Sequence, residues 1–140
     1  MVRIITTAKY NAHTEPIFKS LKLLKLNDLK ISHEYKFYFK YSNNMLPKYF
    51  DSFKLTQNEN IHNHQTRNRN RLHIFFLKHE FAKRFLRNSI IKRINECPPA
   101  IKTKVNTHSL HGFSMYIKQH FIQNYSYHCV LPNCYICQNH

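Results

Sequence analysis

Apolar residues in the first third of the chain recur at spacings of three and four, which indicates helices that bury one face. Thr14-Glu15-Pro16 predicts a helix start, because Thr14 can cap the helix, Glu15 suits its first turn and Pro16 loses no hydrogen bond there. A second start is expected at Asn27-Asp28. The apolar positions that support these two helices are Ile17, Leu21, Leu24, Leu29, Tyr35, Tyr38, Phe39 and Tyr41.

A breaker at residues 43–47, which ends in Pro47, follows the second helix. Tyr49, Phe50 and Phe53 then predict one short turn that packs back on the helices. We therefore expect residues 1–53 to form a helical hairpin.

The pattern changes in the middle of the chain. Residues 54–71 are dense in Asn, His and Arg and predict a polar basic connector without regular structure. The apolar run at 72–77 is consistent with a short β element or with a buried helix, since so short a run does not distinguish the two.

Residues 72–124 predict a second helical part with a basic face. Apolar residues between 81 and 94 favour a helix that is broken near Asn88-Ser89 and ended by Cys97-Pro98-Pro99. A further amphipathic helix is expected after Ser109, and residues 125–140 form an irregular tail rich in Cys and His. The apolar positions of that helix are Leu110, Phe113, Tyr116, Ile117 and Phe121. The expected fold is mainly α, in one domain.

The charge is strongly unbalanced over the 140 residues. Lys and Arg total 22 against 7 Asp and Glu, which gives a net charge of +15, with 11 His in addition. Codons rich in A and T explain part of this basicity, because they encode Lys and Asn and most of the aromatic residues. They do not explain the shortage of acids or the clustering of the arginines. The remaining excess is what an anionic partner such as RNA or DNA requires.

The arginines cluster between Arg67 and Arg93, where nine Lys and Arg occur with one acid, Glu80. Three of the arginines alternate with Asn, so an extended chain would project them to one side, where guanidinium groups suit phosphate oxygens. The Phe residues nearby could stack on unpaired bases, although a core role is the commoner one for such residues. The candidate nucleic-acid-binding residues are Arg67, Arg69, Arg71, Lys83, Arg84 and Arg87.

The tail contains a candidate zinc site. Cys134 and Cys137 have the spacing that lets one turn present two sulfurs to a metal ion, and Cys129 and His140 could complete a tetrahedral set. Free thiols are the alternative, and a disulfide is less expected without a secretory signal. Cys97, next to a proline, is interpreted as structural.

Several function classes are excluded by what the sequence lacks. Gly112 is the only glycine, so Gly-rich phosphate loops and nucleophile elbows are ruled out. Asp28 and Asp51 are the only aspartates and lie far apart, so no carboxylate pair for Mg²⁺ is visible and no catalytic centre is expected. No apolar run approaches the length of a membrane span, and the apolar stretch at residues 1–7 is too short for a signal peptide. We expect an intracellular protein, cytoplasmic or nuclear, without a membrane partner.

Five short segments occur in a familiar order along residues 10–137. They are the segment His13 to Phe18, the segment Leu23 to Leu29, Tyr38 to Tyr41 ahead of Asn44-x-x-Pro47, His64-x-Thr66-Arg67, and Ile94-Asn95-x-x-Pro98 followed by Ser109-Leu110-x-x-Phe113. In this order they resemble the region after the polymerase core in the reverse transcriptases of non-LTR (LINE-type) retrotransposons.

The resemblance implies a helical, basic C-terminal region that helps to hold template RNA or target DNA for the polymerase core. That family carries its catalytic aspartates far upstream, in a motif that this chain lacks, so no catalytic residue is carried over. Two alternatives stay open from the sequence: a non-functional or purely structural remnant of an open reading frame, and a small zinc-binding adaptor.

Overall fold

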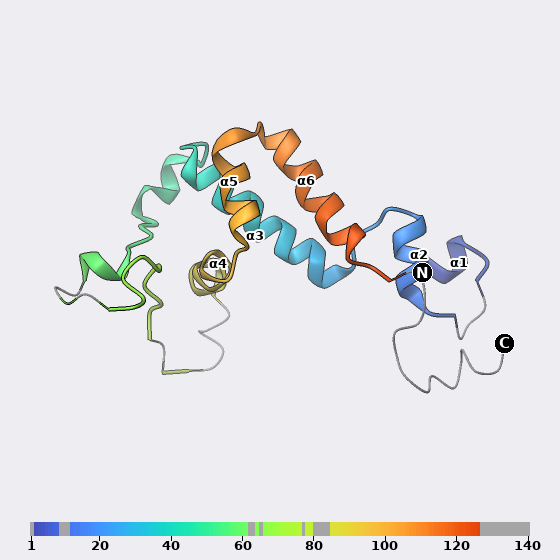
Figure 1. Cartoon of the computed structure of the whole chain (residues 1–140), viewed down its shortest axis with the longest axis horizontal. Helices are drawn as coiled ribbons and strands as arrows, with labels where there is room; N and C mark the ends of the chain where they lie inside the picture. The colour runs from blue at the N-terminus through green and yellow to red at the C-terminus, as the bar shows by residue number, and fades with distance from the viewer. Residues whose placement is uncertain are drawn as a thin grey trace. The chain divides into compact units, whose positions relative to one another are not determined.

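A computed structural model describes residues 2–8, 12–61, 64, 66–76, 78–79 and 85–126 (Figure 1). These residues are mostly helical, which confirms the mainly α fold class, and none of their helices is long and apolar enough to cross a membrane. The elements are α1 (Val2–Ile5), α2 (Thr14–Ser20), α3 (Leu26–Ser42), the 3-10 helices η1 (Lys48–Ser52) and η2 (Asn58–Asn60), α4 (Leu86–Asn95), α5 (Pro99–Thr107) and α6 (Leu110–Gln123).

The chain divides into two compact units. The terminal unit comprises Met1–Lys30 and Met115–His140, and the central unit comprises Ile31–Ser114. The organisation into one domain and the hairpin of the first two helices stay predictions.

The core of the central unit is built from one face of each of its helices. The ring of Phe39 stacks on that of Phe113, with 4.9 Å between centroids, so α3 meets the first turn of α6. The buried residues of each helix lie on one face, with spacings of four in α3 and α5 and of one and three in α4. The buried apolar residues of this core are Tyr35 and Phe39 from α3, Ile90, Ile91 and Ile94 from α4, Ile101 and Val105 from α5, and Phe113 from α6.

Cys97 lies in this core with its thiol buried, as its structural interpretation predicted. Burial raises the pKa of the Cys97 thiol, and a hydrogen bond with the side chain of Tyr35 acts in the opposite direction. The thiol therefore belongs to the packing of α3 against the segment that joins α4 and α5.

Two asparagines end α3. Asn43 donates from its side-chain amide to the carbonyl oxygens of Phe39 and Val105, at 2.9 and 3.2 Å, and so links α3 to α5. Asn44 adopts a φ of 53°, in the left-handed region that Asn tolerates better than most residues. The breaker predicted at residues 43–47 is therefore confirmed, and the side-chain amide of Asn43 and the left-handed backbone of Asn44 mark the end of α3.

Two local predictions about the helices were wrong, the break in α4 and the cap residue of α2. The helix α4 runs unbroken through Asn88 and Ser89, because Asn88 donates to the carbonyl oxygen of Phe75 and Ser89 to the carboxylate of Glu34 instead of competing for the helix backbone. The end of α4 before Cys97-Pro98-Pro99 is as predicted, and in addition Pro98 is the N-cap residue of α5 and Pro99 its first residue. The cap residue of α2 is His13, so Thr14 is already helical.

The short β element expected at 72–77 is reduced to a single bridge pair between Gln57 and Leu72 within the described residues. The side chain of Asn95 hydrogen-bonds the backbone of Leu72, as a neighbouring strand would. Its Oδ1 accepts the N–H of Leu72 and its Nδ2 donates to the carbonyl oxygen of Leu72, each at 2.9 Å. We call this pair of bonds the Asn95 clamp.

One acid is buried in the central unit. Glu34, on α3, is 6% exposed, and its carboxylate accepts hydrogen bonds from the Nε of Arg93 at 3.0 Å and from the hydroxyl of Ser89. A buried carboxylate costs free energy unless it is paired and hydrogen-bonded, and both conditions are met here. The contact therefore joins α3 to α4 through charge as well as through apolar packing.

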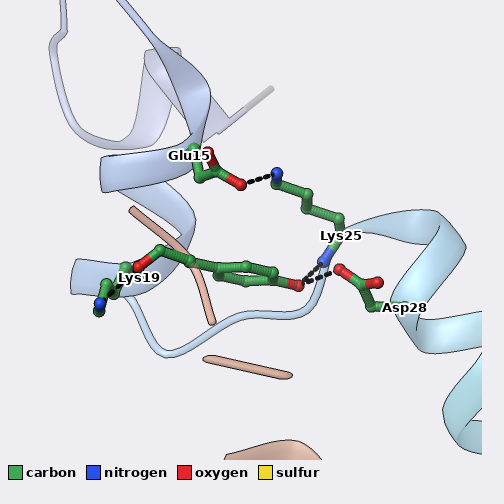
Figure 2. Close-up of polar contacts among 5 residues, drawn as sticks. Glu15, Lys19, Lys25 and Asp28 are labelled. Carbon is green, nitrogen blue, oxygen red and sulfur yellow. Dashed lines mark hydrogen bonds and ion pairs between the residues drawn. The ribbon is translucent and has the colours of Figure 1, made fainter. Parts of the chain in front are cut away.

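The terminal unit is organised around the buried Tyr125, with Glu15, Lys19, Lys25 and Asp28 around it (Figure 2). Its hydroxyl donates to the carboxylate of Asp28 and accepts the backbone N–H of Lys25 at 3.0 Å. Lys19 donates to the carbonyl oxygen of Tyr125, while Lys25 lies 4.9 Å above the tyrosine ring and pairs with Glu15. Tyr125, two residues after the end of α6, is thereby bound to Lys25, which precedes α3, and to Asp28 in its first turn.

Replacing Arg93 with Ala tests the buried ion pair. Arg93→Ala leaves the Glu34 carboxylate without its cation, and we expect the free energy of unfolding to fall by about 2 kcal/mol, measured by urea denaturation. The matched control is Arg67→Ala, an exposed arginine, which should stay within about 0.5 kcal/mol of the wild type. Equal effects of the two substitutions would contradict a structural role for the Glu34–Arg93 pair.

Tyr125 predicts a loss of stability at alkaline pH. Burial, followed by the hydrogen bond to Asp28, raises the pKa of Tyr125 to about 12 from its usual value of 10.0. Because the folded pKa is the higher one, its stabilisation is complete below pH 10 and disappears as the pH approaches 12.

The phenylalanine variant isolates this effect from the titration of the lysines. Tyr125→Phe should be less stable than the wild type below pH 10 by about 1 kcal/mol, and the difference should shrink toward pH 12. Denaturation midpoints of both proteins across this range measure it, and a difference that does not change with pH would refute the expectation.

Candidate nucleic-acid interface

The polar connector folds back on itself in the structure. Asn58 donates its N–H to the carbonyl oxygen of Arg71 at 2.9 Å, Glu59 donates to that of Arg69 at 3.1 Å, and His73 donates to that of Thr56 at 2.8 Å. These bonds make an irregular loop whose two arms lie side by side. We call the described residues between 56 and 73 the arginine loop.

The arginines lie in successive tight turns rather than in an extended chain. The N–H of Arg69 bonds the carbonyl oxygen of Thr66 at 3.1 Å, and the N–H of Arg71 bonds that of Asn68 at 3.0 Å. Alternation with Asn therefore does not place the three side chains on one face in the way that an extended chain would. Each arginine has its own surroundings.

Arg69 already has an acid partner. Its Nη2 lies 3.1 Å from the Oε2 of Glu59 on the opposite arm of the loop. Both groups are partly exposed, so this ion pair adds little stability, but it engages the guanidinium that was expected to meet phosphate.

Arg87 is used inside the protein as well. Its guanidinium lies 4.1 Å above the ring of Phe75 and 5.8 Å from that of Phe53, and its Nη2 donates to the carbonyl oxygen of Lys54 at 2.7 Å. Stacking of this kind suits the flat guanidinium group. Arg87 therefore fastens the start of α4 to the segments on either side of the arginine loop.

Arg67 and Arg71 are exposed, and neither forms an ion pair with another residue in the described part of the chain. Lys83 and Arg84, the other two predicted binding residues, lie outside the described residues. Of the six candidates, the structure thus leaves two cations directed to solvent and gives two others an internal partner.

An open pocket of about 240 Å³ adjoins the arginine loop. Arg71 and Lys92 bring positive charge to it, and the amides of Asn58, Asn68 and Asn95 form part of its wall. Leu72, Ile74 and Glu96 complete the lining.

The wall of this pocket is held in place by hydrogen bonds. Asn58 donates to the carbonyl oxygen of Asn68 at 2.9 Å and its Oδ1 lies 3.3 Å from the Nδ1 of His73, while Asn95 is engaged in the Asn95 clamp. The two cations are therefore exposed donors of a pocket whose amide groups are held by hydrogen bonds, which is the arrangement that suits a phosphate group.

Lys92 was not among the candidate residues from the sequence, although it lies in the basic stretch. The signal that could have found it is the helical register, because Lys92, Asn95 and Glu96 share one face of α4 at spacings of three and four. The Asn95 clamp binds that face to Leu72, the residue after Arg71, and no sequence pattern revealed this contact.

The candidate zinc ligands Cys129, Cys134, Cys137 and His140 lie outside the described residues. Within the described ranges, no three His, Cys, Asp or Glu side chains come close enough to hold a metal ion together.

Comparison of the chain with protein-family models, with curated proteins and with solved structures found no match.

Replacing Arg87 with Lys tests whether the stacking of its guanidinium, apart from its charge, stabilises the protein. Arg87→Lys keeps the positive charge but loses the flat group that lies over Phe75, and we expect the free energy of unfolding to fall by about 1 kcal/mol. Arg67→Lys is the matched control at an exposed position and should leave stability unchanged. Thermal unfolding followed by circular dichroism measures both, and a fully stable Arg87→Lys protein would show that the stack contributes nothing.

Proposed function

We propose that this chain binds the backbone of single-stranded RNA or DNA with little sequence preference, through Arg67, Arg71 and Lys92. The observation that carries the proposal is the pocket beside the arginine loop, where two exposed cations stand among neutral amides. The one acid of this pocket, Glu96, is half exposed and lies 4.0 Å from the guanidinium of Arg93, which also binds Glu34.

Electrostatics favours a polyanionic partner. Lys and Arg bind nucleic acids mainly because each phosphate contact releases condensed counterions, and this contribution does not depend on sequence. A net charge of +15 adds a long-range attraction that raises the rate of association with any polyanion. Amide groups beside the cations add neutral donors for phosphate and sugar oxygens.

The proposal includes a parent protein. From its resemblance to the region after the polymerase core of non-LTR retrotransposon reverse transcriptases, we propose that the chain acts as such a C-terminal part, without catalysis of its own. Its partners would then be RNA or DNA and the polymerase core.

A purely structural remnant is the second candidate, and one observation favours it. Leu23, Leu26 and Leu29 are exposed at spacings of three, and Leu26 is 81% exposed. A face of this kind suits packing against another protein surface such as a polymerase core. A cooperative thermal transition of the monomeric chain would argue against a remnant that has lost its fold, and aggregation without a transition would support it.

The binding proposal is tested by the salt dependence of affinity. We expect the wild-type chain to bind a fluorescent single-stranded oligouridine at low salt, with an affinity that falls steeply as salt is added. Arg71→Ala with Lys92→Ala removes two phosphate contacts and should reduce the slope of log K against log salt by about 1.4, since each contact contributes about 0.7 for a single strand.

The matched control is Lys30→Ala with Lys102→Ala, which removes the same charge from exposed positions elsewhere on the chain. It should weaken binding slightly and leave most of the slope intact. The proposal fails if the wild type does not bind at low salt, or if both double variants change the slope equally.

A further inference from the structure

The central unit has a second open pocket, of about 430 Å³, at the C-terminal end of α3. Its lining combines three aromatic rings with a carboxylate and two small polar side chains. The lining residues are Tyr41, Ser42, Asn44, Leu46, Phe50, Asp51 and Phe53.

Two of the aromatic rings that line the pocket pack against Phe37. Its ring meets those of Phe50 and Phe53 edge to face, with centroids 5.4 and 5.2 Å apart. Phe53 also lies 6.3 Å from Phe50 and from Tyr41 in the same kind of arrangement. Edge-to-face packing of aromatic rings is favourable and directional, so the rings form a preorganised surface.

Backbone contacts hold the rim in the same way. The hydroxyl of Tyr41 accepts the N–H of Leu55 at 3.2 Å, and Asn44 donates its N–H to the carbonyl oxygen of Tyr41 at the same distance. The pocket is therefore built by the end of α3, by η1 and by the residues that follow η1.

The unusual member of this pocket is Asp51. It is one of only seven acids in a chain of net charge +15. Its side chain is exposed in the pocket, and its carboxylate makes no hydrogen bond or ion pair with another described residue. By contrast, Glu15, Asp28, Glu34 and Glu59 are each bound to a partner within the protein.

We infer that this pocket binds an unpaired guanine base of the bound strand, with the aromatic rings against the base and Asp51 on its Watson–Crick edge. A carboxylate only accepts hydrogen bonds, and guanine alone among the bases offers two adjacent donors on that edge, N1–H and the N2 amino group. Aromatic side chains that hold unstacked bases are the common means of reading single strands.

Two further features favour a base over a small cation. The positive charge of the whole chain repels a free cation but attracts a polyanion that carries its base into the pocket. Tyr49, 86% exposed, meets Phe50 edge to face with 5.6 Å between centroids, and so offers a second surface for the neighbouring base.

This inference rests on the proposed binding of single strands, and the experiment separates the two. Fluorescence anisotropy compares oligouridines of equal length that carry one central guanosine, inosine or adenosine. We expect the guanosine strand to bind about tenfold more tightly than the adenosine strand, as for a bidentate contact to a base. The inosine strand, which lacks the N2 amino group, should lie between them.

Asp51→Asn provides the decisive variant, because its amide has one acceptor oxygen and presents an NH2 donor to the second donor of guanine, so that the paired contact is lost. It should abolish the preference for guanosine over adenosine. The matched control is Glu15→Gln, which removes one negative charge from the terminal unit and should keep the preference. Because each result is a ratio between two strands, a general change in electrostatic attraction cancels.

The outcomes are distinct. Oligouridine binding without a preference for guanosine, or a preference that survives Asp51→Asn, overturns the guanine pocket and leaves backbone binding intact. If tetramethylammonium chloride removes the preference for guanosine and an equal concentration of sodium chloride does not, the pocket binds an organic cation. That result overturns the guanine pocket. No binding of any strand at low salt overturns both proposals.

Discussion

Mutual repulsion among 22 Lys and Arg, opposed by only 7 Asp and Glu, is the constraint under which this chain folds. Three of the acids lie where separate segments meet. Glu34 joins α3 to α4 through Arg93, Asp28 holds Tyr125 beside the start of α3, and Glu59 links the two arms of the arginine loop. Two of these carboxylates, Glu34 and Glu59, bind an arginine, and Asp28 accepts the hydroxyl of Tyr125.

The arginines of the central unit differ in whether they have a partner within the protein. Those with a partner of fixed geometry serve the fold: Arg93 binds a buried carboxylate and Arg87 lies on an aromatic ring. Arg67 and Arg71, which have no such partner in the described ranges, are the ones left for an external anion. Counting arginines along the sequence therefore overestimates the cations that a ligand can use.

The helices were largely predictable because their signals are local. Spacings of three and four in 110–121 gave α6, and the asparagines near residue 43 ended α3 where expected. The errors arose where a distant partner decided the outcome. Asn88 and Ser89 stay helical because Phe75 and Glu34 satisfy their side chains, and Leu72 remains outside any strand among the described residues because Asn95 binds it. For the same reason the candidate site was only half predictable: Arg71 was found by composition, whereas Lys92 is placed beside it by a tertiary contact.

The Asn95 clamp also bears on how freely this sequence can change. Its two bonds require a donor and an acceptor on one short side chain, which an amide provides and a carboxylate or an ammonium does not. The codons for Asn and Lys are rich in A and T and differ by a single base, so point mutations exchange these two residues readily. At position 95 that exchange would detach the arginine loop from α4, and a coding sequence that still served binding would have to retain Asn there while its surroundings diverged.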